Sequence, residues 1–391
     1  MDVVQLCADL VRIRSENPPG DTGDVIRYIG DFLDGIGIFS TVVGGDRGKL
    51  NLVTEGPDQP LILCGHVDVV PAMDTGWSHG PYSGDVAEGM VWGRGSTDMK
   101  GGCAAILWAV RELVEKGGEP TARLVFVCDE ETSGMNGIQC VLAKRLISPC
   151  DVLIAEPTHP HHPNIGQKGL IRANVSFRGE PGHGSLYPDI GVSAVMEAYG
   201  LINYLGHLNR REYHPGAGLE EVIRESGKVF GEVFCIPDAG SLLRKIMYNP
   251  GKIEGGEKSN IVAQHCNLEL DIRVPLGCSA GDLLGELRGY SPRADLKCVS
   301  ISEPSLTPAD SRIVRTTCRN IGEVFGIDST PLVQWAASDA RFLRTRGFRV
   351  VEYGPGDITR LHSVDERTPI ESLHAAVEIY GKIMKDYEGS T

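Results

Sequence analysis

The sequence predicts an α/β protein in which a mainly parallel sheet carries an inserted α+β domain. Nearly continuous apolar runs at 61–70, 123–131 and 151–157 are typical of strands buried on both faces of a parallel sheet. Helical patterns near 100–115 and 135–146 separate these runs, and such β-α-β-α alternation indicates a doubly wound layer architecture. Further along the chain the pattern changes and later returns, which indicates a discontinuous domain.

The other elements are read from the same periodicities. Helices are expected at 2–14 and 23–35, separated by the turn cluster Asn17-Pro18-Pro19-Gly20. Elements of the insert are expected at 170–177, 191–206, 246–253, 265–274, 279–288 and 296–302. Later elements are expected at 310–325, 331–334, 339–346, 348–355 and 370–387. The stretch from 209 to 245 is weakly patterned, and no element is assigned to it.

These elements predict two domains, which suits a length of 391 residues. Residues 1–168 and 304–391 are expected to form one discontinuous catalytic domain. Residues 169–303 are expected to form the inserted α+β domain.

Composition excludes several classes of function. The chain has 38 basic and 52 acidic residues, a formal net charge of −14, so a nucleic-acid partner is not expected. No apolar run approaches the roughly 18–20 residues that span a bilayer, and the amphipathic amino end does not resemble a signal peptide. The eleven cysteines include no C-x-x-C pair, so neither a disulfide framework nor a zinc ribbon is indicated. A cytoplasmic location is the simplest expectation.

Acids and histidines follow the predicted strands at their carboxyl ends, where open α/β sheets bind ligands. They are His66, Asp68, Glu130, Glu131, Glu156 and His362, with Asp98 in a nearby loop. Gathered in one crevice, these carboxylates would repel one another strongly without a cation, so the set implies metal. A mononuclear zinc site uses three protein ligands, whereas a mixed set of five fits two metals about 3.5–4 Å apart. Two zinc ions are the leading expectation, with cobalt or manganese as alternatives.

Six segments resemble, in order and spacing, a family of dinuclear-zinc aminoacylases and deacetylases that includes acetylornithine deacetylase, succinyl-diaminopimelate desuccinylase and carboxypeptidase G. They are GHVDVVP (65–71), GRGSTDMKGG (93–102), DEETSG (129–134), AEPT (155–158), GEPGHGSLYP (179–188) and LHSVDE (361–366). The resemblance covers nearly the whole chain. It implies a zinc-peptidase-like catalytic domain and an inserted α+β (ferredoxin-like) domain that serves as lid and dimerisation domain, and therefore a homodimer.

The resemblance also implies roles for the metal-site residues. His66 and Glu156 would hold one zinc, Glu131 and His362 the other, with Asp98 as the bridge. Glu130 would be the general base. Asp68 would orient His66 through its other ring nitrogen, and the peptide between Asp98 and Met99 would be cis.

Three residues of the inserted domain are implicated in the same way. His183 resembles a histidine that reaches across the dimer and hydrogen-bonds the developing oxyanion. Asn260 and Arg273 resemble residues that help to bind the substrate's carboxylate. The planar guanidinium of Arg273 suits that role because it can bind both oxygens.

The expected activity is metal-dependent hydrolysis of an N-acyl-L-amino acid. Glu130 would take a proton from a water that metal makes acidic, and that water would attack the amide carbonyl. A dipeptidase or carboxypeptidase activity is the nearest alternative. A serine or cysteine hydrolase lacks its motifs here, since the sequence has no G-x-S-x-G elbow. A non-catalytic metal- or peptide-binding scaffold is the alternative of a different class, and it would not require Glu130.

Overall fold

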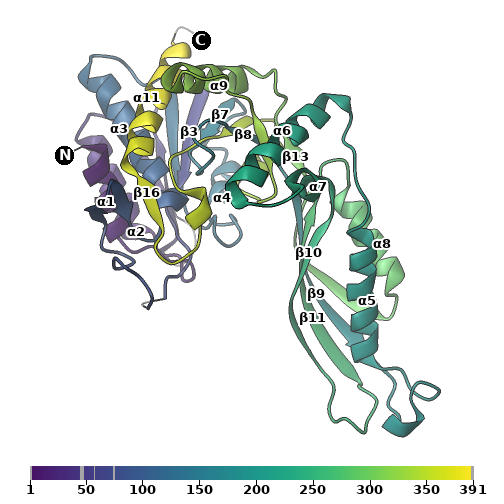
Figure 1. The fold of residues 1–391 in the computed structure, drawn as a ribbon. Coiled ribbons are helices and arrows are strands. Elements are labelled where there is room, and N and C mark those ends of the chain that lie inside the picture. Colours follow the sequence, from purple (N-terminus) through teal and green to yellow (C-terminus); the bar gives the residue numbers. More distant parts are fainter. Residues whose placement is uncertain (1, 45–47, 57, 74, 389–391) are drawn as a thin grey trace. The chain divides into compact units, whose positions relative to one another are not determined.

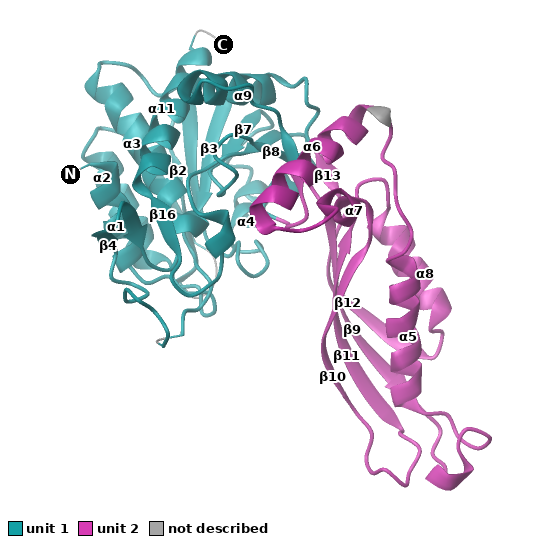
Figure 2. Ribbon diagram, in the orientation of Figure 1, with its two compact units in different colours: residues 1–165, 307–332, 338–391 teal, residues 166–306, 333–337 magenta. Residues whose placement is uncertain are grey.

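The computed structural model describes residues 2–44, 48–56, 58–73 and 75–388 (Figure 1). They divide into two compact units (Figure 2). Unit 1 comprises residues 1–165, 307–332 and 338–391. Unit 2 comprises residues 166–306 and 333–337.

Unit 1 contains both helices and strands, and they alternate between residues 101 and 154. Its helices are α1 (Val3–Arg12), α2 (Gly23–Asp34), α3 (Gly101–Glu115), α4 (Ile138–Ala143), α9 (Arg312–Phe325), α10 (Ala340–Arg344) and α11 (Ile370–Asp386). Its strands are β1 (Ser40–Gly44), β2 (Leu50–Thr54), β3 (Leu61–His66), β4 (Asp85–Ala87), β5 (Met90–Trp92), β6 (Ala122–Val127), β7 (Asp151–Ile154), β15 (Arg349–Glu352) and β16 (Arg367–Pro369). β8 (Asn164–Gln167) and β14 (Leu332–Gln334) cross the boundary between the units.

The main sheet of unit 1 has the strand order β1-β2-β6-β3-β7-β15-β8. Its centre is parallel, because β3 pairs in parallel with both β6 and β7, and β15 pairs in parallel with β7. The pairs at its edges, β1 with β2 and β15 with β8, are antiparallel. The predicted α/β class with a mainly parallel sheet is confirmed.

The central strands end before the apolar runs do. β3 ends at His66, β6 at Val127 and β7 at Ile154, although the runs predicted strands to 70, 131 and 157. The chain turns away at these points; Asp129, for example, has φ of 67°, which a strand does not adopt. As a result, the acidic residues directly after β6 and β7 lie in loops; they are Asp129, Glu130, Glu131 and Glu156.

Four helices of unit 1, α1, α3, α11 and α9, pack against one another in a row. In Figure 1, α3 lies between α1 and α11, and α9 packs on the other side of α11. α1 begins where the Asp2 carboxylate accepts a hydrogen bond from the Gln5 N–H at 2.8 Å, a typical N-cap. No helix within the described residues is both long and apolar enough to cross a membrane.

Unit 2 has the predicted ferredoxin-like arrangement. Its elements are β9 (Gly169–Arg178), α5 (Ala194–Leu208), α6 (Ala217–Phe234), α7 (Ala239–Arg244), β10 (Met247–Gly255), β11 (His265–Val274), α8 (Ala280–Tyr290), β12 (Ala294–Ser302) and β13 (Ser305–Leu306). The antiparallel sheet has the order β10-β11-β9-β12, and α5 and α8 contribute to one apolar core with it. The stretch left unassigned by sequence contains α6 and α7.

Residues 333–337 differ from the expected division of the chain, since they belong to unit 2 and not to the discontinuous domain. The Val333 N–H donates a hydrogen bond to Ser226 Oγ of α6 at 2.9 Å. The Trp335 ring packs against Phe230 and Phe234 of the same helix, with centroids 4.9 and 5.5 Å apart. α6, which the sequence did not predict, therefore binds this segment to unit 2.

A close backbone contact lies next to residues 129–134, here called the acidic loop, and it predicts an effect on stability. A Cβ at Gly137 would lie 1.8 Å from the Cys128 carbonyl oxygen. We expect Gly137→Ala to lower the free energy of unfolding by about 1–3 kcal/mol, measured by denaturant titration, because the added methyl must displace main chain. Gly381→Ala in α11 is the matched control, since nothing lies near its added methyl, and it should raise stability by about 0.5–1 kcal/mol. Equal midpoints for both variants would contradict this packing.

Candidate metal centre

The sheet topology gathers the predicted site residues at one edge of unit 1. His66 ends β3, while Glu130 and Glu156 follow β6 and β7. From β3 the chain passes to β6 on one side and then to β7 on the other, so the loops diverge at the carboxyl end of β3. Open α/β sheets form their ligand crevices at such points. His362 comes from the segment after the parallel strand β15.

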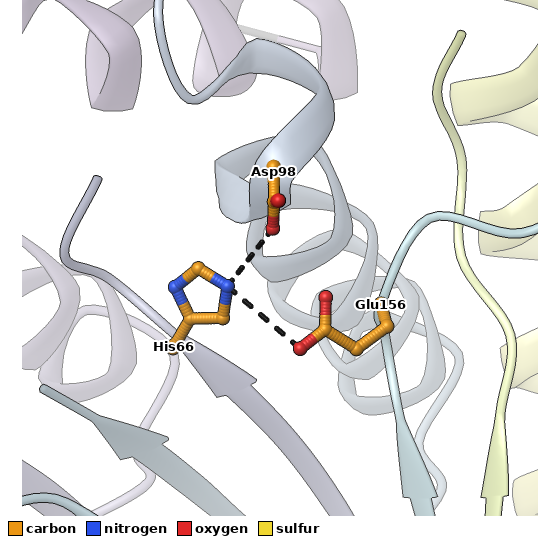
Figure 3. Close-up of side chains that lie close together, drawn as sticks. All are labelled: His66, Asp98 and Glu156. Atoms are coloured by element: carbon orange, nitrogen blue, oxygen red, sulfur yellow. Dashed lines mark hydrogen bonds and ion pairs between the residues drawn. The ribbon is translucent and has the colours of Figure 1, made fainter. Parts of the chain in front are cut away.

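The first group of candidate ligands is His66, Asp98 and Glu156 (Figure 3). His66 Nε2 lies 3.0 Å from Asp98 Oδ1 and 3.8 Å from Glu156 Oε1. His66 Nδ1 lies 2.9 Å from the main-chain oxygen of Asp68. Because a carbonyl oxygen only accepts hydrogen bonds, Nδ1 carries the proton, and in the neutral ring this leaves the lone pair on Nε2, the atom that faces both carboxylates.

The second group is Asp98, Glu131 and His362. His362 Nε2 lies 3.2 Å from Asp98 Oδ2 and 3.3 Å from Glu131 Oε2. Asp98 therefore presents one carboxylate oxygen to each histidine and is shared by the two groups. Within each group, one potential ligand atom per residue lies within 4.8 Å of the others.

The turn that carries Asp98 is held close to β7. It spans Ser96–Lys100 and runs directly into α3. A Cβ at Gly102, in the first turn of α3, would lie 2.2 Å from the Ala155 carbonyl oxygen, so glycine is what permits this approach. Asp98 thereby comes near Glu156, the neighbour of Ala155. The peptide between Asp98 and Met99 is cis, as the family resemblance implied.

The electrostatics of the site fit a bound cation. Burial raises the pKa of Glu156 and of Glu131, and the Asp98 carboxylate raises both further. Glu131 Oε1 is buried and has no hydrogen-bond partner within the described residues. Buried carboxylates of this kind are stable in the charged form only when paired or metal-bound. Imidazole nitrogens with carboxylate oxygens are a ligand mix that zinc accepts.

The two histidines respond to the same carboxylates. Burial opposes protonation of His66, but the charges of Glu156 and Asp98 raise its pKa well above the ordinary value. Hydrogen bonds to Asp98 and Glu131 raise the pKa of His362 to about 10. Burial works against ionisation of Asp98, yet its hydrogen bonds with His362 and His66 lower its pKa. The carboxylates that would pair with a bound cation therefore also favour the charged form of both histidines.

Glu130 stands beside the two groups on a loop that Asp68 holds. The buried Asp68 carboxylate accepts the N–H groups of Glu130 and Glu131, each at 3.2 Å, and the Asn17 amide at 2.8 Å. Its Oδ1 is 3.7 Å from His66 Nδ1, so the main-chain oxygen of Asp68, rather than the expected carboxylate, is the closer partner of the ring. The carboxylate instead positions the acidic loop.

The chain around Glu130 gives it the character of a base. Burial raises the pKa of Glu130 well above its ordinary value, and the charges of Asp339 and Glu131 raise it further. Asp339 was not predicted as a site residue. It is 2% exposed, and neither of its carboxylate oxygens has a hydrogen-bond partner within the described residues. A carboxylate with a raised pKa binds a proton more readily than an ordinary carboxylate does.

Sequence reasoning also missed residues that shape the acidic loop. Asp129 accepts hydrogen bonds from Thr132 Oγ at 2.6 Å and Ser133 Oγ at 2.9 Å, and it forms a close ion pair with Lys49. The threonine and serine of DEETSG were a usable signal, because short hydroxyl side chains next to an aspartate favour such turns. Lys49 and Asn17 lie far away in sequence and gave no signal.

Two of the three predicted site residues in unit 2 lie together. His183 forms a bridge with Ile261, and the Gly184 N–H donates to the Asn260 carbonyl oxygen at 2.9 Å. His183 and Asn260 are exposed. The distance between His183 Nδ1 and Ser185 Oγ is 2.8 Å.

Arg273 lies elsewhere in unit 2. It is near the far end of β11, opposite Leu170, and the His183 segment lies beyond the other end of that strand. The two ends of this ten-residue strand are about 30 Å apart at the usual rise per residue. The Arg273 Nε donates to Asp271 Oδ1 at 2.7 Å. Within unit 2, therefore, Arg273 is not brought together with His183 and Asn260.

Known proteins are similar to this chain over most of its length. Residues 62–386 match the family described as "Peptidase family M20/M25/M40". The chain is 29% identical over 410 residues to a succinyl-diaminopimelate desuccinylase of Cereibacter sphaeroides, covering 99% of each chain. It is 28% identical over 402 residues to an acetylornithine deacetylase of Vibrio vulnificus, covering 99% of this chain and 98% of the relative.

A solved structure shares the fold. The M20 family metallo-carboxypeptidase Sso-CP2 from Sulfolobus solfataricus superposes with a TM-score of 0.82, at 17% identity, with 99% of each chain covered. The family match spans most of the chain, including every candidate metal ligand. The chain therefore belongs to peptidase family M20/M25/M40.

Proposed function

We propose that this chain is a two-metal hydrolase that removes the acyl group from N-acyl-L-amino acids. One observation carries the proposal: Asp98 presents one carboxylate oxygen to His66 and the other to His362, at 3.0 and 3.2 Å. A single carboxylate shared by two ligand groups is suited to bridging two metal ions. The names of the two relatives, a desuccinylase and a deacetylase, support the reaction class.

In this proposal His66 and Glu156 would hold one metal ion, Glu131 and His362 would hold the other, and Asp98 would be shared by both. Zinc is proposed because the ligand set mixes imidazole and carboxylate, and cobalt or manganese would accept the same set. The metals would supply a water of lowered pKa and would polarise the amide carbonyl.

Glu130 supplies the proton chemistry. Its carboxylate takes a proton from the attacking water and returns it to the departing nitrogen, so that an amide and water become a carboxylic acid and an amine. The Asp68 carboxylate keeps Glu130 in place through the 3.2 Å hydrogen bond from its N–H. The raised pKa of Glu130 supports this role because it favours the protonated form that the second step needs.

His183 is proposed to stabilise the oxyanion in the site of a second copy of the chain, with unit 2 as lid and dimerisation domain. Its exposure and its distance along the sheet from Arg273 support a role outside its own chain's substrate contacts. Asn260 would act with His183, because the two segments are hydrogen-bonded. A reducing cytoplasm is proposed as the location, since all eleven cysteines are free thiols in the described part of the chain.

Arg273 is proposed to bind the substrate's α-carboxylate, which predicts a strong preference for free acids. We expect kcat/KM to fall about 10²-fold or more when that carboxylate is converted to a carboxamide, because the charge-assisted contacts of the guanidinium with both carboxylate oxygens are lost. The measurement is a panel of N-acetyl, N-succinyl and dipeptide substrates, each paired with its carboxamide. Equal rates within the pairs would remove Arg273 from the substrate site.

The same panel tests the function itself. Hydrolysis of at least one N-acyl-L-amino acid should disappear with a chelator and return when zinc or cobalt is added. A preference for the dipeptides would favour a dipeptidase or carboxypeptidase instead, as the carboxypeptidase fold likeness allows. A chain that binds metal and hydrolyses none of the panel would be a binding scaffold, and the proposal would be wrong.

A further inference from the structure

A carboxylate outside both ligand groups holds the main chain of the bridging ligand. Glu366 is fully buried, and its Oε1 accepts hydrogen bonds from the N–H groups of Gly95, Thr97 and Asp98 at 2.9, 3.0 and 3.1 Å. Its Oε2 accepts a close hydrogen bond from Arg94 Nη1. Both carboxylate oxygens are thus satisfied without any metal.

Arg94 connects this carboxylate to the other histidine loop. It is 4% exposed, and its Nη2 donates to the main-chain oxygen of His362 at 3.3 Å. The Arg94 guanidinium also lies over the Trp77 ring, 5.4 Å from its centroid. Nη1 of the guanidinium therefore contacts Glu366, and Nη2 contacts the main chain of His362, which would bind the second metal.

The ion pair joins two segments that are far apart in sequence. Asp98 and His362 are separated by 264 positions, yet a ligand atom of each must lie within about 2.2 Å of the same metal ion to bind it. The Asp98 main chain faces Glu366 while its carboxylate faces the histidines. Any change in the Glu366–Arg94 contact would therefore alter the separation between Asp98 and His362.

We propose that Glu366 and Arg94 are positioning residues that set the spacing of Asp98 and His362 and so determine affinity for the metal ion that His362 binds. This inference rests on the proposed two-metal site. Partners that orient metal ligands typically change metal affinity about 10–100-fold when they are replaced. Arg94 contacts the His362 main chain directly, whereas Glu366 contacts the Asp98 main chain directly, so the two residues should affect the metals differently.

Arg94→Lys separates these roles. A lysine keeps the positive charge beside Glu366. Its single ammonium lacks the second nitrogen with which Arg94 donates to the His362 carbonyl. Titration of the metal-free full-length protein with cobalt alone, followed by calorimetry and by the cobalt absorption bands, should show one site near the wild-type affinity. The other site should be weakened about 10–100-fold.

Arg123→Lys is the matched control. Arg123 also contacts two loops through main-chain oxygens, with Nη1 donating to Leu146 at 2.9 Å and Nη2 to Gly56. It lies near the start of β6, at the amino ends of the strands and therefore at the sheet edge opposite the metal centre. It should bind cobalt like the wild type even if its stability falls. Glu366→Gln is the second variant, and it should weaken both sites because it disturbs the Asp98 main chain.

The outcomes are distinct. Two cobalt sites of wild-type affinity in both Arg94→Lys and Glu366→Gln would overturn the inference. So would metal-free variants that are unfolded by circular dichroism, because the ion pair would then serve the fold and not the ligands. A wild-type chain that binds fewer than two cobalt ions would instead overturn the proposed metal centre.

Discussion

Replacing Glu130 with alanine is expected to lower kcat about 10²–10⁴-fold, the usual contribution of a general base, while the protein keeps two metal ions per chain. The reason is that Glu130 belongs to neither ligand group, whereas its neighbour Glu131 lies 3.3 Å from His362 Nε2. Removing a group that acts in the transition state lowers kcat and kcat/KM together. The measurements are steady-state kinetics and metal analysis on the same preparation.

Glu131→Ala provides the comparison. It should lose metal first and activity as a consequence, so added zinc or cobalt should restore part of its rate. Loss of metal from the Glu130 variant, with retention in the Glu131 variant, would show that the two roles are exchanged. Full activity in Glu130→Ala would remove the proposed base altogether.

Replacing His183 with alanine is expected to lower kcat about 10²–10³-fold, the effect of losing one oxyanion donor. If His183 acts across a symmetric dimer, mixing this variant with Glu130→Ala should restore about a quarter of wild-type activity, because half of the dimers are then mixed and each has one complete site. The rate is measured after subunit exchange, which two different affinity tags can verify.

The matched control is the self-exchange of each variant, which should stay inactive. Mixed dimers that are as inactive as their parents would mean that His183 acts in its own chain or has no role in the reaction. Activity of His183→Ala alone near the wild-type level would contradict the oxyanion role directly.

The candidate ligands were predictable because the rule that locates them is topological. His66, Glu131 and Glu156 each lie towards the carboxyl end of an apolar run, and parallel strands end at the same edge of a sheet. Their assignment to two groups came from the family resemblance, and the geometry around Asp98 supports that assignment as a proposal.

What the sequence did not reveal depends on contacts between distant segments. In the sequence, Glu366 is only the last residue of the segment LHSVDE. Its proposed role depends on hydrogen bonds from three N–H groups that lie about 270 positions earlier in the chain. The orienting partner of His66 was predicted to be the Asp68 carboxylate, but the nearer atom is the Asp68 main-chain oxygen, which a sequence pattern cannot distinguish.

Some of the fold was missed for a similar reason. α6 buries Ile223, Ser226 and Phe230, but glycines and charges interrupt its pattern, so its apolar face is evident only once Trp335 packs on it. The short strand β1 is mostly exposed and has little apolar signal of its own. β1 is a strand because it pairs with β2, and this pairing is not evident from the sequence of β1 alone.

The central claim is that Asp98 joins two metal sites that serve one amide hydrolase. It is tested most directly by adding zinc stepwise to metal-free protein while bound zinc and hydrolysis of an N-acyl-L-amino acid are measured on the same samples. We expect binding to saturate at two ions per chain and the rate to rise with occupancy. Asp98→Asn should bind zinc poorly at both sites and stay inactive. Saturation at a single ion, or hydrolysis that proceeds without metal, would contradict the account.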